Sequence, residues 1–257
     1  EDHNGNLWIG TNGGGLIYFD REKGKFSQFL HKPEDPNSLS NDVIVSLWID
    51  HQKKLWIGTY YGGLDCYDGK KFTHFKHDPL DPNSIADDRI WEIMEDSEKN
   101  LWVGTRGGGL DRFDRKENKF YHFKSSEKNS VRSDLIFAFM EDDENNFWIG
   151  TMQGIDVKEK KTGRFIHYSH NDKDQHSLSN NNVLCIQQDS RKLVWIGTRE
   201  GLNLFNKKTN SFQKYRMENG LPDNIILNIL EDDEHNLWIS TPKGIARIIV
   251  NYHDKSD

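Results

Sequence analysis

Short apolar stretches separated by polar turns run along the whole chain, and residues 84–124 show the pattern clearly. Residues 89–95 are apolar on both faces, which predicts an inner strand covered on each side. Residues 101–105 form a second apolar strand, and residues 110–114 alternate apolar with polar positions, as a strand with one buried face does. A fourth strand follows a polar turn at 119–124. This stretch therefore predicts four short antiparallel strands.

The second strand of this unit carries a phrase, Leu-Trp-Ile-Gly-Thr or a close variant, that occurs six times. Its tryptophans are Trp8, Trp56, Trp102, Trp148, Trp195 and Trp238, at steps of 48, 46, 46, 47 and 43 residues. A period in the mid-forties is typical of β-propeller blades and also of helical HEAT repeats. No twelve-residue window shows the apolar stripe of a helix free of glycine or turn residues, so we predict blades of four antiparallel strands.

The number of predicted strands bears on the ring. The sequence predicts three strands, then four units of four strands, then three strands more. We therefore expect an all-β fold in which residues 1–257 form one partial β-propeller of about five and a half blades. The expectation is that they belong to a larger, seven-bladed ring, with a six-bladed ring as the alternative.

Composition narrows the class of protein. The formal net charge is -7, from 34 basic and 41 acidic residues, which disfavours nucleic-acid binding because that needs positive surface. No apolar run is long enough for a spanning helix, so no membrane contact by this segment is expected, and no targeting peptide is visible. The two cysteines, Cys66 and Cys185, make no disulfide framework and are expected to be packing residues.

Acidic turns precede the tryptophan strands. Asp50, Asp96, Asp142 and Asp232 each open such a turn, as suits a carboxylate that accepts nearby backbone N–H bonds. The turns at 141–144 and 231–234 raise the possibility of Ca²⁺, but they lack the ligand spacing of a calcium loop, so a structural role is favoured.

Other recurring residues are also assigned to structure. The repeated tryptophan is expected to pack between blades, with a sugar-stacking platform as the alternative. Tight β turns are expected to account for the glycines of the Gly-Thr strand ends and the glycine runs. His74, His122 and His167 occupy equivalent positions in outermost strands, so they cannot share one ion. We therefore predict no metal site, no cofactor and no catalytic residue.

The loops after the tryptophan strands vary where the rest of the repeat is constant. They carry aromatic, arginine and amide side chains, which stack on and hydrogen-bond sugars or peptides. Simple surface variation is the alternative explanation. The candidate ligand-binding residues are Tyr60, Tyr61, Arg106, Gln153 and Arg199, with Arg89 at the start of the inner strand 89–95.

The pattern E-D-x-x-x-N-L-W-I-G-T-x-x-G-G-L, present at 1–16 and 95–110 and in shortened form at 141–155, resembles the two-component regulator propeller repeat. In that family, propellers form the periplasmic sensor half of membrane-bound hybrid histidine kinases. The resemblance implies a non-catalytic sensor domain of an inner-membrane protein that recognises an oligosaccharide and controls polysaccharide-utilisation genes. It also implies a homodimer formed through the full-length sensor. The family has no fixed ligand motif, so the site residues rest on the loop argument alone.

Two other functions stay open. The flat face of a propeller could be a docking surface, which would make the chain a protein-interaction or dimerisation module. A propeller lyase or glycosidase would need an acid and a base converging on one cleft, for which Glu92, Asp88 and Glu200 are the available carboxylates.

Overall fold

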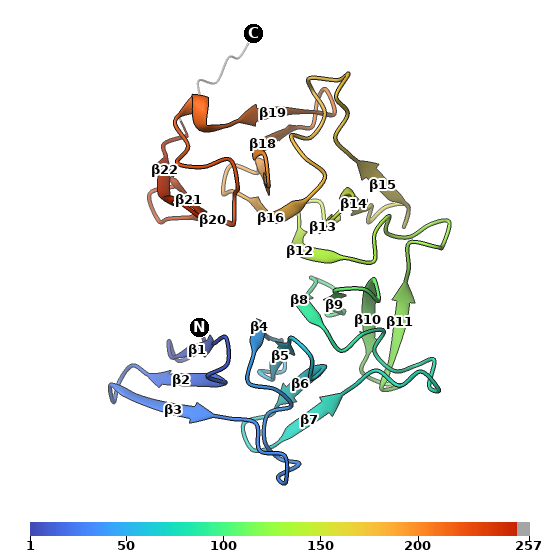
Figure 1. Ribbon diagram of the computed structural model, residues 1–257, viewed down its shortest axis with the longest axis vertical. Coiled ribbons are helices and arrows are strands. Elements are labelled where there is room, and N and C mark those ends of the chain that lie inside the picture. The colour runs from blue at the N-terminus through green and yellow to red at the C-terminus, as the bar shows by residue number, and fades with distance from the viewer. Residues whose placement is uncertain (251–257) are drawn as a thin grey trace. The chain divides into compact units, whose positions relative to one another are not determined.

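A computed structural model describes residues 1–250 as an all-β protein of six small antiparallel sheets (Figure 1). The one helical element among these residues is a 3-10 turn at Met217–Asn219. None of the described residues forms a helix long and apolar enough to cross a membrane.

Each sheet is a meander whose strands pair in chain order, which is what short polar turns between apolar strands produce. The first three sheets comprise β1 (Leu7–Gly10), β2 (Leu16–Asp20) and β3 (Lys25–Phe29); β4 (Ile44–Ile49), β5 (Leu55–Thr59), β6 (Leu64–Tyr67) and β7 (Phe72–Phe75); and β8 (Ile90–Glu95), β9 (Leu101–Thr105), β10 (Leu110–Asp114) and β11 (Lys119–Phe123). The last three comprise β12 (Ile136–Glu141), β13 (Phe147–Thr151), β14 (Gly154–Lys158) and β15 (Phe165–Tyr168); β16 (Val183–Gln188), β17 (Val194–Thr198), β18 (Gly201–Asn206) and β19 (Ser211–Tyr215); and β20 (Asn228–Glu231), β21 (Leu237–Thr241) and β22 (Gly244–Ile248).

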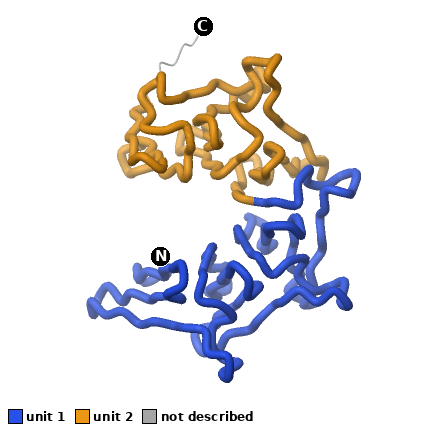
Figure 2. The backbone as a smooth tube through the Cα atoms, viewed as in Figure 1, with its two compact units in different colours: residues 1–136 blue, residues 137–257 orange. Residues whose placement is uncertain are grey.

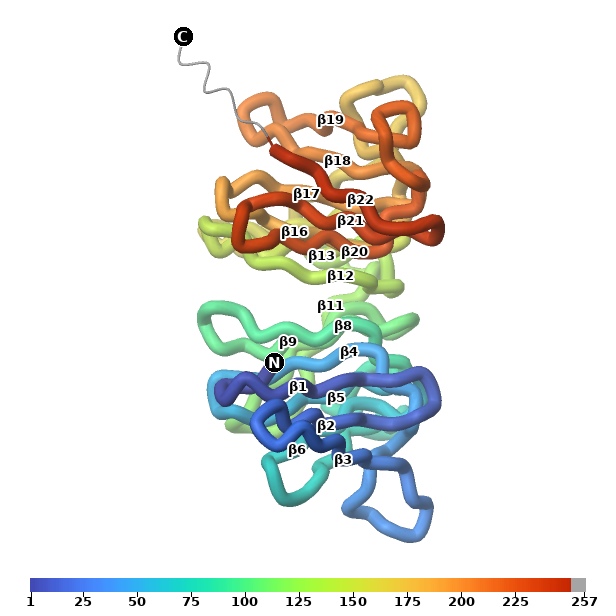
Figure 3. The backbone as a smooth tube through the Cα atoms, turned by 90° about the vertical axis from the view of Figure 1, so that its left-hand side faces the viewer, coloured from blue at the N-terminus to red at the C-terminus, as the bar shows by residue number. Residues whose placement is uncertain are grey.

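The chain divides into two compact units, residues 1–136 and 137–257 (Figure 2). Unit 1 holds the sheets β1–β3, β4–β7 and β8–β11, and unit 2 holds β12–β15, β16–β19 and β20–β22. Within unit 1 the inner strands β4 and β8 lie side by side, and within unit 2 β16 lies beside β20 (Figure 3). Successive sheets of a unit therefore stack face to face, as propeller blades do.

The hydrophobic core lies between these stacked sheets. In unit 1, Trp56 on β5 packs against Phe113 of the next sheet, with ring centroids 5.5 Å apart. In unit 2, Trp148 on β13 packs against Phe205 in the same way, at 5.2 Å. Both tryptophans are almost completely buried, at 3% and 4% exposure, so the expected packing role of the repeated tryptophan is confirmed.

The turn aspartates accept backbone N–H bonds, as expected, and they also bind the tryptophan ring. Asp50 Oδ1 accepts the backbone N–H groups of Gln52 and Lys54, each at 2.9 Å. Its Oδ2 accepts the indole N–H of Trp56 at 2.9 Å, so one carboxylate ties the turn to the buried ring. The sequence predicted the turn but not this bond to tryptophan.

The strand glycines have a different role from the predicted one. Gly58 lies inside β5, and a Cβ there would stand 2.7 Å from Cγ2 of Ile90 on the next sheet. Close approach of two sheets therefore requires this glycine, so the assignment of Gly58 to a tight turn is wrong. The turn explanation does hold for Gly63, which adopts φ +85° after the strand.

The strand predictions are confirmed closely. β9 and β10 have the predicted bounds, and β8 and β11 differ by one residue at one end. The described residues contain three strands, four sheets of four strands and three final strands, as the repeat indicates. The seven-bladed ring stays a prediction.

Candidate functional site

Four of the six predicted ligand-binding residues lie together in unit 1, at the loop ends of β5, β8 and β9. The rings of Tyr60 and Tyr61 meet edge to face, with centroids 4.5 Å apart. The Nη1 of Arg106 lies 3.5 Å from the hydroxyl oxygen of Tyr60. Backbone bonds place the loops: Arg106 N donates to Arg89 O at 3.0 Å, which joins the fourth residue to the group. We call Tyr60, Tyr61, Arg89 and Arg106, together with Trp91, the aromatic–arginine cluster.

The two arginines of the cluster are held differently. The guanidinium carbon of Arg106 lies 4.5 Å from the ring centroid of Trp91, a cation–π contact. Arg89 forms a two-point ion pair with Asp87, with N–O distances of 2.8 and 2.5 Å. Burial opposes ionisation of Asp87, but the bonds from Arg89 outweigh it and lower the pKa of Asp87.

The cluster combines an exposed ring with oriented cations. Tyr61 is 63% exposed, and Arg89 and Arg106 are partly exposed beside it. A flat ring beside N–H donors can stack on an apolar ligand face and hydrogen-bond its polar rim. The described residues contain no group of three or more His, Cys, Asp or Glu side chains that could hold a metal ion.

Gln153 and Arg199, the other two predicted residues, lie in unit 2. Each occupies the loop after a tryptophan strand and each is exposed. The backbone N–H of Gln153 donates to Thr151 Oγ1 at 3.0 Å, and that of Arg199 donates to Asn182 O at 3.2 Å. Arg199 follows its strand threonine directly, at the repeat position of Tyr60 and Arg106, whereas Gln153 stands one residue further along its loop, after Met152.

Two of the three carboxylates considered for an enzyme, those of Glu92 and Asp88, have structural contacts in this fold. Glu92 on β8 accepts a bond from Ser46 Oγ at 3.3 Å, and burial raises the pKa of Glu92 to about 7. Asp88 Oδ1 accepts the backbone N–H of His77 at 2.7 Å. Glu200 is exposed in unit 2, where its carbonyl accepts a bond from Arg216.

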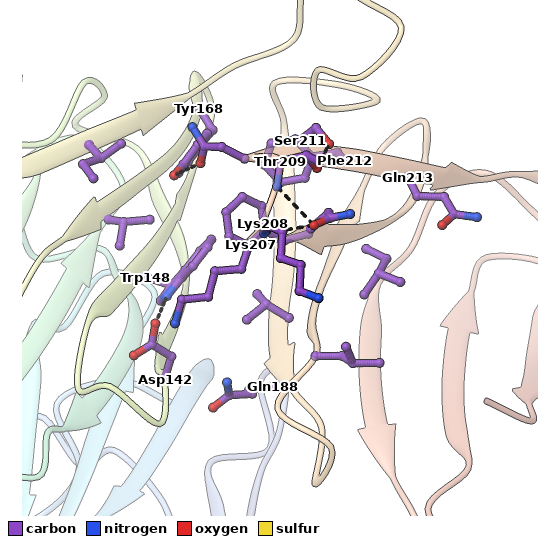
Figure 4. A pocket seen from close by; sticks show the side chains of 18 of the residues that line it. Asp142, Trp148, Tyr168, Gln188, Lys207, Lys208, Thr209, Ser211, Phe212 and Gln213 are labelled. Atoms are coloured by element: carbon purple, nitrogen blue, oxygen red, sulfur yellow. Dashed lines mark hydrogen bonds between the residues drawn. The ribbon is translucent and has the colours of Figure 1, made fainter. Parts of the chain in front are cut away.

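Unit 2 contains a groove between its first two sheets that sequence reasoning did not predict (Figure 4). Its volume is about 1540 Å³, and it runs along β15 and β19. Tyr168 on its wall donates a bond to Asn210 at 2.7 Å, and Lys207 extends across it toward Asp142 and Trp148. Lys207 ends in an ion pair with Glu144 at 2.5 Å.

Comparison with unit 1 explains why the groove is open. At the equivalent junction in unit 1, Arg115 Nη2 bonds Glu95 at 2.6 Å and Asp50 at 3.3 Å, and this side chain lies between the two sheets. Lys207 and Gln188 occupy the positions of Arg115 and Glu95 in the repeat. The Lys207 side chain is 65% exposed against 19% for Arg115, so it does not fill the junction. A lysine point charge cannot make the two-point contact of a guanidinium.

A second unpredicted feature is a pair of histidine–aspartate contacts in unit 1. His122 Nδ1 lies 2.6 Å from Asp111 Oδ1, and His74 Nδ1 lies 2.7 Å from Asp65 Oδ1. Unit 2 holds a third contact between His167 and Asp156 at 2.6 Å. The sequence signal was the aspartate that recurs in the third strand of these sheets, opposite the histidine of the fourth.

Stacked meander sheets with aromatic cores between them define the blades of a β-propeller. The sequence model for the two component regulator propeller matches this chain in five segments, residues 1–13, 84–107, 130–153, 177–200 and 220–243. The chain belongs to this family. The repeat copy around Trp56 lies outside the matched segments, but it has the same sheet and the same aspartate–tryptophan bond.

Solved structures give the same fold. One similar structure is described as the extracellular domain of the hybrid two component system BT3049 from B. thetaiotaomicron, with 25% identity and a TM-score of 0.81. The match covers 96% of this chain and 32% of that one, so this chain spans about a third of that relative.

More distant structures are similar in fold alone. PorZ, a surface component of the type-IX secretion system of Porphyromonas gingivalis, is 19% identical with a TM-score of 0.73, over 95% of this chain and 37% of that one. Virginiamycin B lyase from Staphylococcus aureus is 11% identical with a TM-score of 0.69, over 98% and 83%. The comparison with curated proteins gives no match.

Proposed function

We propose that this chain is a ligand-sensing propeller in the extracellular, periplasmic part of a hybrid two-component sensor, and that it binds an oligosaccharide without chemically changing it. The family and the likeness to the BT3049 extracellular domain support the class. The full-length sensor would be an inner-membrane protein that dimerises and controls polysaccharide-utilisation genes.

The observation that carries the ligand proposal is the aromatic–arginine cluster. Tyr61 offers a ring that is 63% exposed, and Arg106 is fixed between the Tyr60 hydroxyl and the Trp91 ring. Sugar rings present an apolar face surrounded by hydroxyl groups, so an exposed ring beside fixed N–H donors is complementary to them. Gln153 and Arg199, in equivalent loops of unit 2, stay predicted ligand-binding residues.

Exposed aromatic and apolar side chains at two sheets support the proposed larger ring. Trp238 on β21 is 41% exposed, whereas Trp195 at the same repeat position is 3% exposed. Phe26 on β3 is 67% exposed and stacks on Phe19. Phe120 and Phe113 occupy the same repeat positions in the third sheet, where Phe113 packs against Trp56 of the preceding sheet. Each face thus exposes aromatic residues that pack against a neighbouring sheet elsewhere in the repeat, which supports the proposal of a larger ring.

Calorimetry with an oligosaccharide panel tests the function. Tyr61→Ala and Arg106→Ala are expected to weaken binding at least tenfold, because each removes a ligand-facing group and little buried surface. Arg112→Ala is the matched control, since Arg112 makes a comparable contact with Tyr121, at 5.0 Å, on the outer strands of the same sheet. Equal affinity in all three variants would reject the cluster as the site, and release of new reducing ends would reject a non-catalytic role.

A further inference from the structure

The ring of His122 lies between two hydrogen-bond acceptors. Nδ1 is 2.6 Å from Asp111 Oδ1, and Nε2 is 2.9 Å from the carbonyl oxygen of Pro82. A peptide carbonyl and a carboxylate both accept, so the ring meets both only when each nitrogen carries a proton. That is the imidazolium form. His74 has the same arrangement with Asp65 and Pro36, at 2.7 and 3.0 Å.

His122 and Asp111 together hold the loop of residues 76–89, which leads into β8. His122 holds the loop at Pro82, and Asp111 holds it a second time, because its Oδ2 accepts the backbone N–H of Ala86 at 2.8 Å. A third bond runs from Phe120 N to Asn83 O at 2.9 Å.

This loop positions the aromatic–arginine cluster. It ends at Arg89, whose carbonyl accepts the backbone N–H of Arg106 at 3.0 Å. It also presses on the turn after Arg106, since a Cβ at Gly108 would lie 2.7 Å from Cβ of Ala86. Movement of the loop at Pro82 and Ala86 therefore reaches Arg89 and Arg106 through direct contacts.

We propose that protonation of the His122–Asp111 pair regulates the aromatic–arginine cluster, by tying the 76–89 loop to the outer strands at low pH and releasing it at Pro82 at higher pH. The inference rests on the proposed function for its ligand, but the loop tether itself does not need one. When the pair gives up its proton to water, one N–H remains for two acceptors. The charged carboxylate keeps it, because hydrogen bonds to charged groups are the stronger ones, and the Pro82 carbonyl loses its donor.

The charges around the ring are consistent with this direction. The bond to Asp111 raises the pKa of His122, and Lys124, which directly follows β11, opposes the shift. Burial raises the pKa of the Asp111 carboxyl, and the bond from His122 opposes this, so the pair holds its proton into a higher pH range than a free histidine. From the loop, Asp78 and Asp81 accept backbone bonds from Leu80 and Asn83.

The sheet β16–β19 provides an internal comparison. Asn203 and Lys214 occupy the positions of Asp111 and His122. Asn203 Oδ1 accepts the backbone N–H of Ser179 at 2.8 Å, as Asp111 does from Ala86. The equivalent loop is thus held there by an amide that does not titrate in the neutral range.

The test uses the whole chain labelled with 5-fluorotryptophan, with the Trp91 resonance assigned from Trp91→Phe. Trp91 lies under Arg106, so its fluorine shift reports the cluster without any ligand. Between pH 5 and 9 the Trp91 resonance is expected to titrate with the midpoint measured on the His122 ring. The Asp111→Asn/His122→Lys variant, which copies the pair of the β16–β19 sheet, is expected to abolish that titration.

Two further variants keep the test decisive. His122→Gln retains a neutral donor and replaces the double variant if that one does not fold. His77 is the loop's own histidine, with Nδ1 2.8 Å from Ile85 O, and His77→Gln is expected to leave the Trp91 titration unchanged. Titration that survives loss of His122, or a wild-type Trp91 resonance that does not follow His122, would overturn the tether. Neither outcome bears on oligosaccharide binding, which the Tyr61→Ala variant tests separately.

Discussion

Trp148 donates its indole N–H to Asp142 Oδ2 across 2.8 Å, which links a nearly buried ring to the turn six residues before it. The same bond joins Asp50 to Trp56, Asp96 to Trp102, Asp189 to Trp195 and Asp232 to Trp238. A buried indole needs a partner for its N–H. In these five sheets one oxygen of the aspartate therefore holds the turn and the other satisfies the N–H of the tryptophan ring.

Asp142→Ala is expected to lower the free energy of unfolding by about 2–4 kcal/mol, because it leaves the Trp148 N–H and two turn N–H groups without their acceptor. The two turn bonds, from Glu144 and Asn146, measure 2.9 and 2.8 Å. Urea unfolding followed by circular dichroism measures the change.

Asp232→Ala is the matched control. Asp232 makes the same bonds, but its tryptophan, Trp238, is 41% exposed and can bond to water instead. The loss should be clearly smaller than for Asp142. Equal losses at the two sites would mean that the indole bond adds nothing beyond the turn.

The open groove of unit 2 should close when the arginine and glutamate of the unit 1 junction are introduced at the equivalent positions. Lys207→Arg with Gln188→Glu places a guanidinium and a carboxylate where Arg115 and Glu95 make their 2.6 Å contact. An arginine that donates to two carboxylates, as Arg115 does to Glu95 and Asp50, is stabilising where it is partly shielded from water, so the double variant should melt higher than the wild type. Each single variant is the control, because it supplies only one partner.

The readout for this pair is a double-mutant cycle on melting temperature. A coupling energy indistinguishable from zero would show that the junction is not shaped by these two positions. A crystal structure of the double variant should show the groove between Tyr168 and Lys207 narrowed.

Glu92 should make stability fall as the pH rises. Its folded pKa is about 7, above the ordinary 4.5, because the carboxyl is buried on β8. The unfolded chain therefore loses this proton first. The contribution is fully present below pH 4.5 and disappears as the pH rises through about 7.

Glu92→Gln should remove that slope and stabilise the protein at pH 8 relative to the wild type. Glu34→Gln, at an exposed loop position, is the control and should leave the slope intact. Unfolding curves at several pH values between 4 and 8 measure the difference. A slope unaffected by Glu92→Gln would contradict this assignment.

Much of the fold could be predicted because its information is local. The phrase around Trp102 predicts a strand, and the glycines and polar turns on each side predict its ends, so the predicted bounds of β9 and β10, 101–105 and 110–114, agree with the structure. The Asp96 turn is equally local, since its partners lie within six residues.

Contacts between repeats could not be read in the same way. That Gly58 faces Ile90 depends on how two sheets stack, and the His122–Pro82 bond joins residues 40 apart in the chain. The cluster was predicted in part, because Tyr60 and Arg106 occupy one repeat position in neighbouring sheets. Trp91 was missed, since a residue of an inner strand gives no sign that it supports a loop.

The bond between Asp142 and Trp148 has a consequence for how such chains can change length. The bond lies wholly within one repeat, and the ring packs against Tyr168 of its own sheet and Phe205 of the adjoining sheet. A duplication or loss of one whole repeat thus preserves every such bond and re-creates the same junction at the new boundary. A repeat architecture therefore tolerates the gain or loss of a repeat during evolution, whereas the same change would disrupt a core shared by distant segments.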